Sequence, residues 1–274
     1  MEGKPLIVQN TFGHGPCVTV WVHGWLRSSR MFEPLLPFMD PHADRWIFVD
    51  LPGYGENRKA SGEFTVDRAV TELAQFTEEA GLDQAHWVGH SMGGLVIQRL
   101  AFRVPQRVIS LVGIAPVPIT GLALNERARE IYQKACKSVE ARFRVIARLA
   151  DPATATETIQ NWVVQSFSET QEDALWTYLE SWSVERQELT PPDFSSIPFV
   201  LVAGAGDPAI TKARITGSIA SLYRHLEVHI LDGIGHLPVE EDTFRVAQAL
   251  AKWPEKQVGS ETSSHLSEAP RTSR

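Results

Sequence analysis

Ser91 lies among three glycines in the stretch HWVGHSMGGLVIQRLAF, which spans residues 86–102. The residues before Ser91 predict a strand and those after it predict a helix. Glycine weakens both kinds of element by about 0.5–1 kcal/mol per position, so Gly89, Gly93 and Gly94 indicate a backbone that larger side chains would not allow. The pattern G-x-S-x-G is typical of a very tight strand-to-helix turn, in which the residues two before and two after the serine have no room for a β-carbon. We therefore expect the Ser91 hydroxyl to stand clear of the backbone at the positive end of a helix.

Strand-like and helix-like segments alternate along most of the chain. Continuous apolar runs bounded by glycine and proline are typical of strands buried on both faces, and they occupy residues 18–22, 46–49, 108–114 and 198–203. The segment LEVHIL at 226–231 alternates like a half-exposed strand, and residues 66–80 show helical spacing of apolar positions. The alternation predicts an α/β fold with a mostly parallel sheet and helices on both faces. Because little chain precedes Cys17, we expect the edge of the sheet to be trimmed.

The alternation stops at residues 118–195, where the patterns are helical alone. This stretch predicts an all-helical cap, inserted into an α/β core made of residues 1–117 and 196–253. The sequence TPPDFSSIP, at residues 190–198, closes the insertion and returns the chain to the sheet. Residues 254–274 are polar and rich in Ser, Glu and Thr, so we expect a disordered tail there.

Polar residues follow the carboxyl ends of two further predicted strands. In a parallel sheet, functional side chains usually lie at this edge. Asp207 lies in GAGDP after the strand that ends near Ala203, and His236 lies in GIGHLP after the strand that ends near Leu231. The preceding strand ends in GIAPVP without an acidic residue. Asp207 is therefore the one candidate for a catalytic acid at the strand ends where this residue usually lies. The order Ser91, Asp207, His236 predicts a catalytic triad of nucleophile, acid and base.

The stretch VHGWL at residues 22–26 ends another predicted strand. We expect the backbone N–H of Trp25 to point into the site and to form an oxyanion hole together with the N–H of Met92. His23 and His90 flank these positions, and we expect them to act as hydrogen-bonding supports rather than as bases.

Five motifs occur in order along the chain: HGW, DLPGYG, GHSMGG, GAGD and GIGH. With them the chain resembles the α/β-hydrolase superfamily from Val18 to about Trp253, and in particular its capped esterases and C–C bond hydrolases. It looks most like small carboxylesterases of the pimeloyl-ester hydrolase type, which also carry HGW and DLPG. The cap shows no comparable match. The resemblance implies an α/β-hydrolase fold and a serine mechanism, but it does not extend to the substrate.

The predicted cap is rich in aromatic and basic residues. We expect its later aromatics to wall a substrate pocket, partly as apolar lining and partly as packing; they are Trp162, Phe167, Trp176, Tyr178 and Trp182. The basic residues of its first part form either a solvated helix face or a surface that attracts an anionic substrate; they are Arg127, Arg129, Lys134, Lys137, Arg142, Arg144 and Arg148.

No metal or organic cofactor is predicted. His225, Glu227 and His229 alternate along one strand, which is typical of a solvated strand face. The glycines of GAGDP are not followed by the rest of a dinucleotide fingerprint. Two cysteines are too few for a disulfide scaffold, and we expect Cys17 to be a buried, inert thiol.

The composition and charge limit the kinds of partner that we expect for this chain. A net charge of −7 disfavours nucleic acid and anionic membrane surfaces. The longest apolar stretch, residues 111–124, is broken by two prolines and too short to span a bilayer. The opening residues MEGKPLIVQN lack a basic segment followed by an apolar stretch, so we expect no secretory signal. We expect a cytoplasmic protein without a membrane span and draw no oligomeric state from the sequence.

These features predict a serine hydrolase that cleaves a carboxylic ester, or a related thioester or lactone, of a small and partly apolar molecule through an acyl-enzyme. Two alternatives remain open at this point. The same triad serves C–C bond hydrolases of ring-cleavage products, although that group often has Asn where this chain has His90. A non-catalytic ligand-binding protein with the hydrolase fold is the alternative from another class. Serine at position 91 argues against enzymes of this fold that use an aspartate nucleophile.

Overall fold

A computed structural model describes residues 8–185, 196–251 and 253. Most of TPPDFSSIP and the predicted tail at 254–274 lie outside the described residues.

A seven-stranded sheet forms the centre of the molecule, in the order β1-β3-β2-β4-β5-β6-β7. Its strands are β1 (Val8–Gly13), β2 (Cys17–Val22), β3 (Asp44–Asp50), β4 (Ala85–His90), β5 (Val108–Ile114), β6 (Phe199–Gly204) and β7 (Leu226–Leu231). Only β1 is antiparallel to its neighbour among the described strands. The α/β fold with a mostly parallel sheet is therefore confirmed.

The edge of the sheet differs from the expectation. Strand β1 precedes Cys17 and pairs along its length with β3. Its sequence, VQNTFG, is too polar to predict a strand. An edge strand needs a partner on one side only, so main-chain hydrogen bonds place it without an apolar run. Cys17 begins the next strand and is half-buried rather than buried, because it lies where the sheet opens to solvent.

Alternate residues of each buried strand enter two separate cores, because successive side chains of a strand point to opposite faces. Val20 and Val22 join the core under α1 (Val66–Glu79) and α2 (Met92–Arg103), whereas Trp21 joins the core under the 3₁₀ helix η1 (Ser29–Phe38) and helix α9 (Thr243–Leu250). Shorter elements are η2 (Gly55–Asn57), η3 (Pro105–Arg107), α7 (Lys212–Arg214), η5 (Ile215–Ile219), η6 (Ala220–Leu222) and α8 (Pro238–Glu241).

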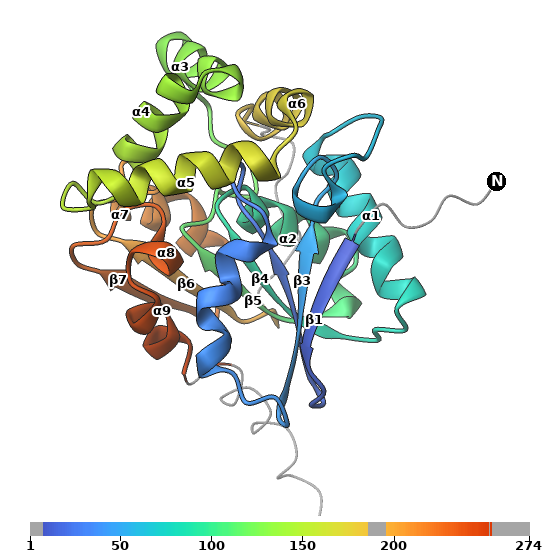
Figure 1. Cartoon of the computed structure of the whole chain (residues 1–274). Coiled ribbons are helices and arrows are strands. Elements are labelled where there is room, and N and C mark those ends of the chain that lie inside the picture. Colours follow the sequence, from blue (N-terminus) through green and yellow to red (C-terminus); the bar gives the residue numbers. More distant parts are fainter. Residues whose placement is uncertain (1–7, 186–195, 252, 254–274) are drawn as a thin grey trace, which may run out of the picture.

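A helical insertion separates β5 from β6. It contains α3 (Glu126–Lys137), α4 (Val139–Leu149), α5 (Thr156–Glu169) and α6 (Glu172–Trp182). These helices gather over one end of the core, and α5 lies across that end (Figure 1). An isolated β-bridge between Tyr54 and Thr170 is among the contacts that join this cap to the loop after β3.

One of the cap's basic residues lies inside the cap rather than on its surface. Arg142 is 1% exposed and donates hydrogen bonds to the carbonyls of Ala135 and Cys136 and to the hydroxyls of Ser166 and Thr170. It therefore ties α3, α4 and α5 together. Most of the other basic residues of the first cap helices are exposed.

Candidate active site

Ser91 occupies the turn between β4 and α2, with φ 51° and ψ −113°. A positive φ is unusual for a residue with a β-carbon and stores strain. The turn is held by the Ser91 N–H, which donates to the Ile114 carbonyl (3.0 Å), and by the Ser91 carbonyl, which accepts from the Val117 N–H (3.0 Å). A β-carbon at Gly89 would lie 2.4 Å from the Gly93 carbonyl oxygen. The turn thus has the tight geometry that the glycines predict.

The structure brings Ser91, His236 and Asp207 together from the ends of three strands. The Ser91 Oγ lies 2.8 Å from His236 Nε2, and His236 Nδ1 lies 2.7 Å from Asp207 Oδ2. A carboxylate only accepts hydrogen bonds, so Nδ1 carries the proton on the Asp207 side. Nε2 of the neutral ring is then free to accept the Ser91 hydroxyl proton.

The Asp207 carboxylate is built to stay charged. Burial opposes its ionisation, but the adjacent His236 and the N–H groups of Ala209 and Ile210 more than offset that effect, so the pKa of Asp207 lies below its usual value. Its Oδ1 accepts from these two N–H groups at 2.7 and 3.0 Å. A charged Asp207 stabilises the imidazolium that would form on His236.

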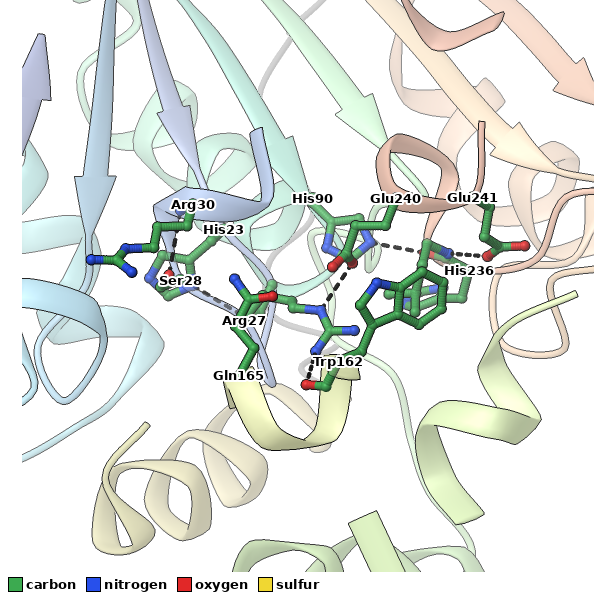
Figure 2. A network of polar contacts seen from close by, with 12 residues as sticks. His23, Arg27, Ser28, Arg30, His90, Trp162, Gln165, His236, Glu240 and Glu241 are labelled. Carbon is green, nitrogen blue, oxygen red and sulfur yellow. Dashed lines mark hydrogen bonds and ion pairs between the residues drawn. The ribbon is translucent and has the colours of Figure 1, made fainter. Parts of the chain in front are cut away.

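Glu241 holds the loop that carries His236, and no sequence signal singled it out. Its carboxylate accepts hydrogen bonds from the N–H groups of Gly235 and Leu237, on either side of the histidine, at 2.7 and 2.9 Å. It also accepts from the N–H of Asp151 in the cap. The His236 N–H itself donates to the Leu149 carbonyl of the cap (2.7 Å). The loop with the histidine is therefore anchored to the cap. Figure 2 shows Glu241 beside His236.

Gly24 and Trp25 form a turn directly beside the nucleophile. A β-carbon at Gly24 would lie 2.4 Å from His90 Nδ1 and 3.3 Å from the Ser91 β-carbon. The Trp25 indole donates to the Leu175 carbonyl of α6 (2.8 Å), which fixes the side chain against the cap. Met92 is the first residue of α2, where helix N–H groups have no intrahelical partner.

His23 and His90 support this geometry, as the sequence predicts. The Leu51 N–H donates to His23 Nε2 (3.1 Å), so Nδ1 carries the proton and donates to the Gly24 carbonyl (2.9 Å). His90 Nε2 donates to the His236 carbonyl (2.8 Å). Burial lowers the pKa of His90 to about 3, which keeps the ring neutral.

A cavity of about 50 Å³ opens beside Ser91 and His236 and is bounded mainly by apolar side chains. The core supplies Trp25, Leu26, Arg27, Ala209, Ile210 and Leu237, and the insertion supplies Leu122, Tyr132, Ile146, Leu149 and Trp182. A larger outer cleft of about 430 Å³ shares Leu122, Tyr132, Leu149 and Ala209 with it and extends past Arg127, Arg148 and Arg214.

Of the five cap aromatics expected to wall this cavity, the structure brings Trp182 to it. Trp162 packs against Arg27, Phe167 against Arg142 and Tyr178 against Tyr54, while Trp176 is 39% exposed on the outer surface. The helical spacing of these residues could not tell which helix face meets Ser91. Tyr132, which the sequence reasoning missed, lines the cavity instead.

Within the ranges that the structure describes, no three His, Cys, Asp or Glu side chains gather as a metal-binding group. His229 pairs with Glu227 on β7 (3.0 Å), which fits the predicted strand face. None of the described helices combines the length and apolar character that a bilayer crossing requires.

Residues 19–249 match the family described as "Alpha/beta hydrolase family". The chain belongs to this family. It is 36% identical over 109 residues to a pimeloyl-[acyl-carrier protein] methyl ester esterase of Yersinia enterocolitica, and the match covers 40% of each protein. The chain thus spans about two fifths of the length of this curated relative.

Solved structures of this fold superpose over most of the hydrolase chain. A thermophilic esterase from Thermogutta terrifontis has a TM-score of 0.76 at 20% identity and covers 91% of this chain and 93% of its own. A meta-cleavage product hydrolase from Pseudomonas fluorescens IP01 has a TM-score of 0.74 at 16% identity, with coverages of 91% and 94%. At these identities the likeness establishes the fold alone.

Proposed function

We propose that this hydrolase cleaves a carboxylic ester, or a related thioester or lactone, by a serine mechanism. The observation that carries the proposal is the hydrogen-bonded chain from Ser91 through His236 to Asp207 at the wall of a cavity. Such a chain is the arrangement that activates a serine hydroxyl for attack on an acyl carbon. The pimeloyl-ester relative supports an ester bond over other hydrolysable bonds.

In the proposed reaction the Ser91 Oγ attacks the carbonyl carbon while His236 Nε2 accepts its proton. The N–H groups of Trp25 and Met92 stabilise the oxyanion of the tetrahedral intermediate; in related enzymes, loss of one such donor costs about 2.7–4 kcal/mol of barrier. The imidazolium then gives its proton to the leaving alcohol, and an acyl group remains on Ser91. Water, deprotonated by His236, releases the acid and restores the serine.

The cavity indicates a small acyl or alcohol group. A volume of about 50 Å³ favours a short apolar group beside Ser91. The remainder of the substrate would pass between Tyr132 and Ala209 into the outer cleft, which adjoins the cavity at these residues. Apolar walls at the reacting centre exclude water and strengthen the interactions with the oxyanion.

Chromogenic acetyl and butyryl esters test the mechanism. We expect a burst of leaving group followed by slower turnover, and a mass increase on the Ser91 peptide after acid quench. Ser91→Ala should abolish both, whereas the exposed Ser168→Ala on α5 should leave both unchanged. Equal turnover by Ser91→Ala and wild type would refute the proposal. Ring-cleavage products cleaved faster than every ester would favour the C–C hydrolase, and binding without turnover would favour a ligand-binding protein.

A further inference from the structure

A buried ion pair joins two of the loops that form the candidate active site. Arg27 follows Trp25 by two residues, and Glu240 follows His236 by four. Arg27 Nε lies 2.9 Å from Glu240 Oε2, and the two side chains are 2% and 7% exposed. Figure 2 shows Arg27 between Glu240 and Trp162. The pair therefore links the turn that contains Trp25 to the segment that follows the histidine.

Arg27 also closes its own turn and contacts the cap. Its backbone N–H donates to the Gly24 carbonyl (3.2 Å), which completes the turn around Trp25. Its Nη1 donates to the Trp162 carbonyl of α5 (3.1 Å), and its guanidinium carbon lies 5.6 Å from the centre of the Trp162 ring. One side chain thus holds the turn against α8 and against the cap.

The loop after β7 does not need this pair for its own position, because Glu241 already accepts hydrogen bonds from N–H groups on both sides of His236. Burying two charges is expensive, and apolar replacements of buried ion pairs are often neutral or stabilising. Burial raises the pKa of Glu240, and the nearby Arg27 opposes that rise. The contacts of Arg27 converge instead on the Gly24–Arg27 turn, which the pair and the Trp162 carbonyl hold in place.

We propose that Arg27 is a positioning residue for the oxyanion hole. Held by Glu240 and by the Trp162 carbonyl, it keeps the Trp25 N–H opposite Ser91, where it can stabilise the tetrahedral intermediate. The inference rests on the proposed serine mechanism. It predicts a loss of transition-state stabilisation when the ion pair is removed, with little change in the binding of the ground-state substrate.

The test compares Arg27→Met with Arg99→Met on the acetyl ester. Arg99 serves as the control, since it is also buried, donates to the Asp67 carboxylate and to the Ile119 carbonyl, and does not line the cavity. Loss of a whole oxyanion donor lowers kcat by about 10²–10³. Because Arg27 only positions that donor, we expect Arg27→Met to lower kcat by about tenfold to a hundredfold, with KM within threefold.

A second readout separates positioning from a structural role. A trifluoromethyl ketone forms a hemiketal oxyanion on the serine, so its affinity reports the oxyanion hole. We expect this affinity to fall in Arg27→Met by the same factor as kcat, while Arg99→Met keeps both kcat and ketone affinity within threefold of the wild type. Glu240→Gln, which keeps a hydrogen-bond acceptor without charge, should lie between wild type and Arg27→Met. Arg27→Lys keeps the charge but not the fork that reaches both partners, and it should recover only part of kcat.

The positioning role of Arg27 and the serine mechanism can be refuted separately. If wild type shows a burst that depends on Ser91, and Arg27→Met matches Arg99→Met in kcat and ketone affinity, the positioning role is refuted and the serine mechanism stands. If Arg27→Met does not fold, the same comparison uses Glu240→Gln and Arg27→Lys, and unchanged ketone affinity in both overturns the inference. Absence of Ser91-dependent turnover in the wild type refutes the mechanism itself.

Discussion

Gly93→Ala should increase the distance between the two N–H donors of the proposed oxyanion hole, those of Trp25 and Met92. A β-carbon at Gly93 would lie 2.1 Å from the Val22 carbonyl oxygen and 2.6 Å from that of His23, whereas ordinary contact begins near 3.4 Å. Both oxygens belong to backbone, so no side chain can rotate away. These two carbonyls directly precede the Gly24–Trp25 turn. Helix α2, with Ser91 and Met92 at its start, must therefore move away from the turn by about 1 Å to accommodate a methyl group.

Two opposing effects set the change in stability. Alanine favours a helix over glycine by about 1 kcal/mol, and overpacking costs about 1–3 kcal/mol. The contact with rigid backbone puts Gly93→Ala at the upper end of that range, so we expect a net loss of about 2 kcal/mol in the free energy of unfolding. Activity is more sensitive, because a misplacement of about 1 Å at a catalytic centre can lower the rate by about 10².

Urea unfolding and steady-state hydrolysis of the acetyl ester measure both quantities. Gly217→Ala serves as the control, since a β-carbon there meets nothing within 4 Å. We expect this control to keep the stability and kcat of the wild type. If Gly93→Ala retains kcat within threefold, the steric explanation of the glycine pattern around Ser91 is wrong.

Two further predictions concern the triad and the cavity. Asp207→Asn keeps the size of the side chain but favours the wrong tautomer of His236, and in a related triad such a change lowers kcat by about 10⁴; activity within a few-fold of wild type would show that another carboxylate does this work. Trp182→Leu and Tyr132→Leu change the cavity wall, so each should shift the ratio of kcat/KM for butyryl over acetyl esters by about threefold or more. The control Trp176→Leu should leave this ratio unchanged. Equal ratios in all three variants would place specificity in the core loops.

The parts of this site that sequence could predict are those that local geometry controls. The glycines around Ser91 indicate a turn that only small neighbours permit, and the structure has that turn, with Ser91 at φ 51°. Asp207 and His236 follow parallel strands, and the carboxyl ends of parallel strands meet at one edge. Each inference needs only a few consecutive residues and the direction of a strand. For the same reason the fold class was accessible from the alternation of apolar runs and helical patterns.

The parts that sequence could not predict depend on contacts between distant segments. Arg27 and Glu240 are 213 positions apart, and Arg27 and Trp162 are 135 apart. Nothing local distinguishes Arg27 from an exposed arginine, or Trp182 from the cap aromatics that only pack. Helical spacing shows that a helix has an apolar face, but the face that meets Ser91 is set by the packing of helices α3–α6 on one another and on the core.

A buried histidine far from the candidate active site makes folding stability depend on pH. His86 in β4 is 4% exposed, and its ring lies edge-on to Trp253 at 5.2 Å. The Trp253 indole donates to Ser110 Oγ (3.0 Å), and Ser110 Oγ lies 2.7 Å from His86 Nδ1. These surroundings favour the neutral imidazole over the charged one. Burial lowers the pKa of His86 from 6.5 to about 4.

The sign of the pH dependence follows from comparing the folded and unfolded chains. Below about pH 6.5 the unfolded chain binds a proton at His86, whereas the folded chain does not bind it until about pH 4. The free energy of unfolding therefore decreases progressively as the pH falls through this interval. One pKa unit corresponds to about 1.4 kcal/mol, which makes the loss about 3 kcal/mol by pH 4. The measurement is the free energy of unfolding at pH 7 and pH 4.5 for wild type and His86→Gln. His86→Gln will be less stable at pH 7, but between the two pH values it should lose about 2–3 kcal/mol less than the wild type. Parallel pH profiles would show that the folded protein admits a charged His86, because a histidine that is protonated equally in both states contributes no pH dependence.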